Sequence, residues 1–101
     1  MKLRWTDRAR RNLLAIGRYI AQDNPVAARR WGERLQTCAQ QAATMPMAGR
    51  VVPELHRNDI REVFVRPYRI VYRVREDAID VLTVFEGHRL FDTTDLPEID
   101  K

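Results

Sequence analysis

The spacing of apolar residues changes once along this chain, from a helical period to a period of two. Before residue 46, apolar side chains recur every three or four positions, which places them on one face of an α-helix. From Ile60 onward, three short runs rich in Val, Ile and Tyr follow one another closely, as the strands of an antiparallel meander do. A chain that places helices first and neighbouring strands afterwards is expected to fold as an α+β domain.

Two helices are expected in the first half of the chain. Thr6 is a favourable N-cap for the first helix, which should end near Gln22. Asn24 and Pro25 start the second, because proline suits the first helical position, where its missing N–H costs nothing. The apolar stripes of the two helices are Ala9, Leu13, Ile16 and Ile20, then Ala28, Trp31, Leu35, Cys38, Ala42 and Met45. The connection is so short that the two helices must form an antiparallel hairpin.

Strands are expected at residues 3–5, 60–65, 68–74 and 79–85. The first is short, and the last is apolar on both faces, which favours a place inside the sheet. Residues 51–58, which contain Pro53, are expected to form a loop or an irregular edge. The predicted architecture is therefore α+β, with a short N-terminal strand, an antiparallel helical hairpin and a three-stranded antiparallel meander (β-α-α-β-β-β).

Alternation along residues 68–75 divides the side chains between the two faces of the sheet. One set is Tyr68, Ile70, Tyr72 and Val74, and the other is Arg69, Val71, Arg73 and Arg75. The first set belongs beneath the helices, which leaves the second on an open, positively charged face. A functional surface is expected on that face. Arg69 and Arg73 also have a structural alternative, since they could pair with Glu62 or with acidic residues near the C-terminus.

Arginine dominates the charge of the chain. Eighteen Lys and Arg residues face fourteen Asp and Glu residues, and only Lys2 and Lys101 are lysines. The last ten residues contain the acidic side chains Asp92, Asp95, Glu98 and Asp100. Residues 1–91 therefore carry seventeen basic against ten acidic residues. Guanidinium groups bind phosphate and carboxylate alike, so the composition favours a polyanion or an acidic protein as partner, unless it reflects only an arginine-preferring genome.

The length of 101 residues allows one domain, at residues 1–91, followed by an acidic tail at 92–101. No apolar run reaches the roughly 18 residues that a membrane-spanning helix needs, and the charged N-terminus does not resemble a secretory leader. A soluble, cytoplasmic protein is expected. Cys38 is the single cysteine and the two histidines are far apart, so neither a disulfide, a metal site nor a bound cofactor is expected.

Three motifs carry a resemblance to a known family. Pro46-x-x-Gly49-Arg50 follows the second helix, residues 68–74 read Y-R-I-V-Y-R-V, and residues 79–89 give a final strand with a basic segment after it. With the element order, these motifs resemble the RelE/ParE toxin superfamily, and its ParE-like, plasmid-stabilisation branch in particular, over residues 2–91. The resemblance implies the toxin of a type II toxin–antitoxin system, neutralised by a small ParD-like antitoxin that fills an apolar groove and pairs charges around it.

The resemblance implies one of two activities. RelE-like members cleave mRNA on the ribosome, whereas ParE-like members are described as poisons of DNA gyrase. Arg61, Arg69 and Arg89 fall at or near positions that a ribonuclease would use around the phosphate, and His88 is the candidate acid–base group. However, the open sheet has no lysine, no tyrosine follows Tyr72, and arginine is a poor general base.

Inhibition of DNA gyrase is therefore the favoured activity, with ribosome-dependent mRNA cleavage as the alternative. A non-toxic, degenerate binding module is a third possibility. The surface that contacts the target or the antitoxin is expected to use the sheet and first-helix arginines Arg69, Arg73, Arg75, Arg10, Arg11 and Arg18.

Overall fold

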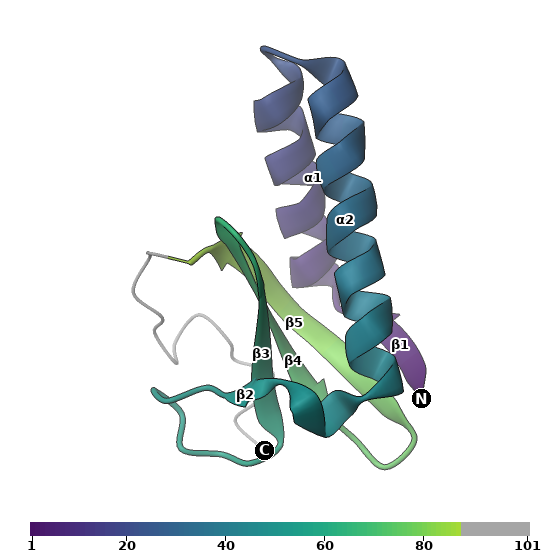
Figure 1. The fold of residues 1–101 in the computed structure, drawn as a ribbon, viewed down its shortest axis with the longest axis vertical. Coiled ribbons are helices and arrows are strands. Elements are labelled where there is room, and N and C mark those ends of the chain that lie inside the picture. The colour runs from purple at the N-terminus through teal and green to yellow at the C-terminus, as the bar shows by residue number, and fades with distance from the viewer. Residues whose placement is uncertain (88–101) are drawn as a thin grey trace.

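The computed structural model describes residues 1–87, so that His88, Arg89 and the acidic tail at 92–101 lie outside the described residues. The elements follow in the order β1 (Lys2–Trp5), α1 (Asp7–Ala21), α2 (Pro25–Thr44), a 3-10 turn (Pro46–Ala48), β2 (Arg50–Val51), β3 (Ile60–Val65), β4 (Tyr68–Val74) and β5 (Ala78–Glu86). Figure 1 shows the two helices packed side by side and the strands gathered below them. The predicted order of elements is confirmed.

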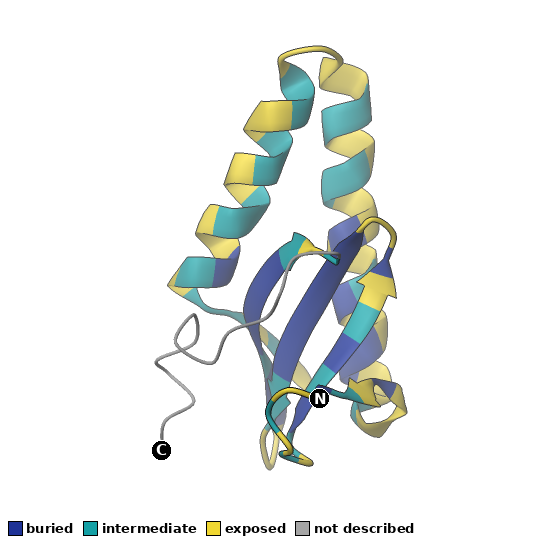
Figure 2. Ribbon diagram, turned by 90° about the vertical axis from the view of Figure 1, so that its left-hand side faces the viewer, coloured by how far each residue is buried: buried dark blue, intermediate teal, exposed yellow. Residues whose placement is uncertain are grey.

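Helices α1 and α2 form an antiparallel hairpin whose upper part extends beyond the sheet (Figure 1). Thr6 Oγ1 accepts a hydrogen bond from the Ala9 N–H, and Asn24 Oδ1 accepts one from the Ala27 N–H. Both predicted N-caps are confirmed. Figure 2 shows buried residues concentrated in the sheet and the lower part of the hairpin, while the upper turns of both helices are partly or fully exposed. Neither helix within residues 1–87 has the length and apolarity needed to cross a lipid bilayer.

The sheet has five strands in the order β1-β5-β4-β3-β2. Strands β3, β4 and β5 form the predicted antiparallel meander, and β5 lies inside the sheet as expected. The N-terminal strand β1 pairs with β5 in the parallel sense, which closes the other side of that strand. Val51, the first residue of the segment expected as a loop or irregular edge, forms β2 together with Arg50, and this strand pairs with β3 only at Arg61 and Glu62.

The main core lies between the hairpin and the sheet. Its buried members are Ala9, Leu35, Ala39, Val65, Tyr68, Ile70, Val81 and Val84. Tyr72 and Ile79 continue it beneath Ala42 and Ala43 near the end of α2. The side chains of β4 that were expected beneath the helices are found there.

The other face of the sheet is not open, and this prediction is wrong. Val52 packs there with Val71 and Leu82 in a second buried apolar cluster, and Leu55 packs against the margin of that cluster. Several side chains that point to this face are apolar, and leaving them uncovered would expose a contiguous apolar patch to water. The segment after β2 also supplies Asp59, which pairs with Arg73 at 3.2 Å, and Glu54, which lies 3.7 Å from Arg69.

Beyond the end of the short strand β1, the start of α1 takes the place of a neighbouring strand beside β5. Thr6 Oγ1 donates a hydrogen bond to the Val81 carbonyl at 2.8 Å. Asn12 Oδ1 accepts two, from Thr83 Oγ1 at 2.7 Å and from the Val84 N–H at 3.1 Å. The register of β5 against β4 shifts at this point. Side chains of α1 thus satisfy the strand groups that no neighbouring strand reaches.

Candidate functional site

The arginines on the covered face of the sheet lie in three clusters, each built around one carboxylate. The clusters are Arg50–Glu62–Arg69, Arg57–Asp59–Arg73 and Arg4–Asp80–Arg75. Each contains one arginine that the sequence predicts as part of a functional surface. The structure gathers these three predicted arginines on one face, as expected, but it engages each of them with a carboxylate.

The Glu62 cluster is the most deeply buried of the three. Glu62 is 1% exposed and Arg69 is 5% exposed. The Arg69 Nε donates to Glu62 Oε1 at 2.9 Å, and the Arg50 Nε donates to Glu62 Oε2 at 2.7 Å. The guanidinium of Arg69 also lies 5.7 Å and 5.1 Å from the ring centres of Phe64 and Phe85. The structural alternative for Arg69, pairing with Glu62, is confirmed, and this side chain is not presented to an external phosphate.

Asp59 and Asp80 are the central carboxylates of the other two clusters, and each pairs with two arginines. Arg73 Nε donates to Asp59 at 3.2 Å, so Arg73 pairs with Asp59 and not with Glu62. Arg75 Nε donates to Asp80 at 2.6 Å. Burial acts to raise the pKa of both carboxyls, but the bonds and charges of the arginines outweigh it, and the pKa of each carboxyl is lowered. Both acids therefore stay charged and keep their arginines in place.

Arg61, the other described residue proposed for phosphodiester cleavage, lies apart from Arg69. Its Nη1 donates to the carbonyls of Gly49 at 2.9 Å and Met47 at 3.1 Å, which ties the end of the 3-10 turn to β3. Because side chains alternate along β3, Arg61 points to the face opposite that of its neighbour Glu62, which holds Arg69. The two described arginines of the predicted catalytic set are therefore on opposite faces of the sheet.

The arginines of the helical hairpin contrast with those of the sheet. Arg10 makes a long contact with Asp7 at 3.4 Å, and both side chains are exposed. Within residues 1–87, no ion pair is found for the other hairpin arginines Arg8, Arg11, Arg18, Arg29, Arg30 and Arg34. The sequence prediction included three of the hairpin arginines, all on α1, and missed those on α2. The free positive charge therefore lies mainly on the helices.

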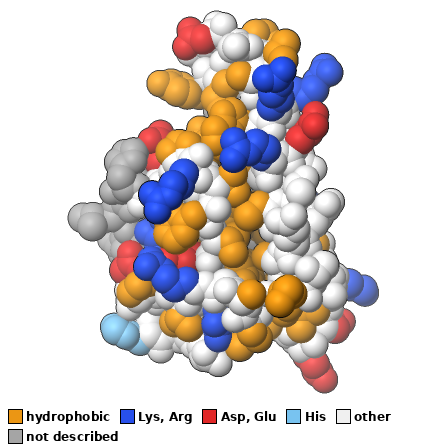
Figure 3. Space-filling model, in the orientation of Figure 1, with side chains coloured by type: hydrophobic (Ala, Val, Ile, Leu, Met, Phe, Trp, Pro, Cys, Tyr) orange, Lys and Arg blue, Asp and Glu red, His pale blue; other side chains and the backbone are white. Residues whose placement is uncertain are grey.

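An open groove of about 900 Å³ runs between α2 and the outer edge of β3. Its lining residues are Arg30, Glu33, Arg34, Thr37, Cys38, Gln41, Phe64, Val65 and Arg66. A hollow of about 250 Å³ against Trp31 extends it along α2, and one of about 350 Å³ against Pro67 and Gly87 extends it past the β3–β4 turn. In Figure 3 the groove is seen as a strip of apolar side chains down the middle of the molecule, with arginines on both sides.

The groove side of α2 has a regular spacing. Ala27, Trp31, Arg34, Cys38 and Gln41 recur at alternating steps of four and three. This is the spacing of a seam against which a second helix packs. Arginines rim the seam and Glu33 is the single acidic lining residue, so the groove suits an apolar segment flanked by carboxylates.

The outer edge of β3 also has backbone groups that no described strand uses. Val52 N–H donates to the Ile60 carbonyl, and β2 ends its pairing at Glu62. Since the polar groups of a strand alternate between its two sides, those of Phe64 point outward into the groove. An extended partner segment could therefore add to this edge.

Trp31 and Cys38 lie where the core meets the groove. The Trp31 ring packs edge-on against Tyr68, with ring centres 5.2 Å apart, and carries the Arg34 guanidinium at 4.5 Å. Trp31 thus packs against the core, in keeping with its place on the apolar stripe, and also forms part of the groove wall. Cys38 is half-buried, and burial raises the pKa of its thiol. Within residues 1–87 no group of three potential ligands could hold a metal ion.

Comparison with known proteins agrees with this geometry. The sequence profile of the family described as the ParE toxin of type II toxin–antitoxin system, parDE, matches residues 3–91. The chain belongs to the ParE toxin family. The profile covers the hairpin, the groove and the sheet from Leu3 onward in this ParE-family toxin.

Two curated relatives and one solved structure extend the comparison. Y4kP of Sinorhizobium fredii (strain NBRC 101917 / NGR234), which has toxin in its name, is 39% identical over 87% of this chain and 90% of its own. Toxin RelE2 of Caulobacter vibrioides (strain ATCC 19089 / CIP 103742 / CB 15) is 38% identical over 85% of this chain and 94% of its own. A structure of the chromosomal ParDE system from P. aeruginosa has the same fold, with a TM-score of 0.70 at 22% identity, over 85% of this chain and 95% of that one.

Proposed function

We propose that this ParE-family toxin is neutralised by a small ParD-like antitoxin that occupies the groove between α2 and β3, and that the free toxin inhibits DNA gyrase. The groove is the observation that carries the first half of this proposal. It combines an apolar floor, a helix-packing seam on α2 and rims lined with arginine, which together suit an acidic amphipathic segment.

Charge reversal in the groove tests the antitoxin site. Arg34→Glu with Arg66→Glu should abolish co-purification of the antitoxin encoded beside the toxin gene, because carboxylates would then face carboxylates. The matched control, Arg11→Glu with Arg18→Glu on α1, makes the same change in charge outside the groove and should retain the antitoxin. If both variants retain it, or both lose it, the antitoxin does not use this groove.

The proposal of gyrase as target rests on family membership together with the positions of the sheet arginines. Arg69 is buried against Glu62, and Arg61 lies on the opposite face, so these two do not form a phosphate site. Purified toxin should therefore inhibit supercoiling by purified gyrase, and an excess of antitoxin should relieve the inhibition. Normal supercoiling at a large molar excess of toxin would refute this target.

The relative named RelE2 supports mRNA cleavage as a second candidate. Cleavage of mRNA in a reconstituted translation reaction, and its loss on Arg89→Ala, would establish that activity in place of gyrase inhibition. Expression of the chain without its antitoxin separates both candidates from a non-toxic binding module, which would leave growth unaffected.

A further inference from the structure

More than half of the excess positive charge of residues 1–91 lies on the helical hairpin. Residues 7–44 contain seven arginines and three acidic residues, Asp7, Asp23 and Glu33, which gives +4. Residues 1–91 carry +7 in all, so the rest of that domain, although longer than the hairpin, contributes +3. The hairpin is therefore the electrostatic footprint of this protein, although it holds little more than a third of the sequence.

One face of α1 presents this charge away from the groove. Arg10, Arg11, Leu14 and Arg18 are exposed, and the 3.6-residue period places them within a little over a quarter of the helix circumference. We call these four residues the α1 ridge. None of the residues that line the groove or its two extensions belongs to α1. The ridge therefore lies outside the groove and its two extensions.

We propose that the outer surface of the hairpin, centred on the α1 ridge, binds the phosphate backbone of duplex DNA. Arg11 and Arg18 are two turns apart, roughly 10 Å along the axis, and neither has an acidic partner among the described residues. A helix about 10–12 Å across fits a major groove about 12 Å wide, so side chains on its flanks lie next to phosphates. A free guanidinium matches phosphate oxygens in a two-pronged geometry.

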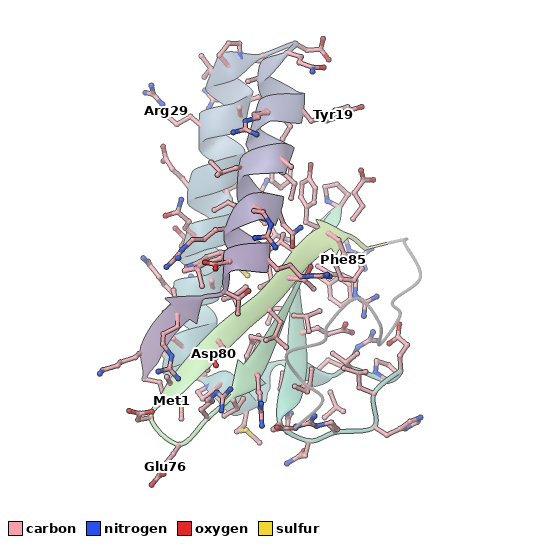
Figure 4. The ribbon with its side chains drawn as sticks, turned by 180° about the vertical axis from the view of Figure 1, so that it is seen from behind. Met1, Tyr19, Arg29, Glu76, Asp80 and Phe85 are labelled. Atoms are coloured by element: carbon pink, nitrogen blue, oxygen red, sulfur yellow. The ribbon has the colours of Figure 1, made fainter. Side chains whose placement is uncertain are left out.

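The chemistry of the ridge favours DNA over an acidic protein. A protein interface needs an apolar centre that is depleted in charge, whereas the ridge offers one apolar side chain, Leu14, 58% exposed, among three arginines and the exposed Asp7 that contacts Arg10. Interfaces with DNA are more polar and much more positive. The hairpin also projects from the body of the molecule, and Figure 4 shows Arg29 and Tyr19 pointing outward from its two sides, so a rod-like partner could approach without meeting the sheet.

The test is the salt dependence of DNA binding by the full-length toxin, followed by fluorescence anisotropy with a short labelled duplex of mixed sequence. Each phosphate contact contributes about 0.9 to the slope of log K against log salt between about 50 and 200 mM. Arg11→Gln with Arg18→Gln should therefore reduce the slope by about two and weaken binding. The matched control, Arg4→Gln with Arg75→Gln, removes the same charge from arginines engaged by Asp80 and should leave the slope close to that of the unsubstituted protein.

Three results would overturn the inference. They are an undiminished slope in the α1 variant, an equal fall in the control, and displacement of DNA by polyglutamate at equal charge concentration, which would indicate an acidic protein partner. Antitoxin capture by the α1 variant is measured in parallel. Because the groove and the ridge share no residue, loss of DNA binding with retained capture separates this inference from the proposed function.

Discussion

The side chain of Asn12 links the middle of α1 to β5 through two hydrogen bonds. Its Oδ1 accepts hydrogen bonds from the hydroxyl of Thr83, which is 6% exposed, and from the N–H of Val84, which is 2% exposed. Asn12→Ala would leave both buried donors without an acceptor. At about 1 kcal/mol or more for each unsatisfied donor, the expected loss in the free energy of unfolding is about 2–4 kcal/mol. For a domain of this size, even 2 kcal/mol corresponds to a fall of roughly 8–16 °C in Tm.

Urea unfolding of the purified chain, followed by circular dichroism, measures this loss directly. Asn12→Asp is the matched control, because a carboxylate oxygen in the same position accepts both bonds and should keep stability within about 1 kcal/mol. Thr83→Val removes one of the two donors. The double variant Asn12→Ala with Thr83→Val should therefore lose less unfolding free energy than the two single variants together. If Asn12→Asp is as destabilising as Asn12→Ala, the role of Asn12 as a hydrogen-bond acceptor is refuted.

Other side chains give similar tests. Gly49→Ala should destabilise the fold by roughly 1–3 kcal/mol in thermal melts, because a Cβ there would meet the buried Tyr72 hydroxyl, and adding Tyr72→Phe should recover part of the loss. Glu62→Gln should cost about 3 kcal/mol, because buried Arg69 loses its nearest counter-charge and keeps the more distant Glu54, whereas the exposed Glu33→Gln should change little. The lowered pKa of Asp80 stabilises the fold above the unfolded pKa of about 3.9, and this contribution is lost as pH falls through the folded value. Acid titration should therefore show a steep fall in stability below about pH 4, and Asp80→Asn, which is less stable at pH 7, should show a shallower one.

The helices and the meander could be predicted because their signals are local. Thr6 and Asn24 cap helices through bonds to residues three positions away, and alternation within β4 is a property of one short segment. The parallel pairing of β1 with β5 joins residues about 76 positions apart, and no local pattern records it. The cover over the second face was missed for a similar reason, since residues 52–59 gain their apolar contacts only in the folded chain.

The site was less predictable than the fold, although one error was avoidable. The two-residue β3–β4 turn sets Val65 opposite Tyr68 and therefore Arg61 opposite Tyr72. Since Tyr72 was expected beneath the helices, Arg61 had to face the same way, away from Arg69. The groove, by contrast, is formed by α2 and β3, which are separated in sequence and brought together only by the tertiary fold.

The pairing of β1 with β5 also has a consequence for synthesis of the toxin. Strand β1 cannot pair until its partner strand β5, which begins at Ala78, has been synthesised. Thr6 and Asn12 also form hydrogen bonds with β5. Contacts between such distant segments form slowly, because the intervening chain must first be closed into a loop. A nascent chain still lacking its last strand cannot complete the sheet or its main core. The toxin therefore reaches its folded form only when almost all of the domain has left the ribosome, and prematurely terminated products should be harmless.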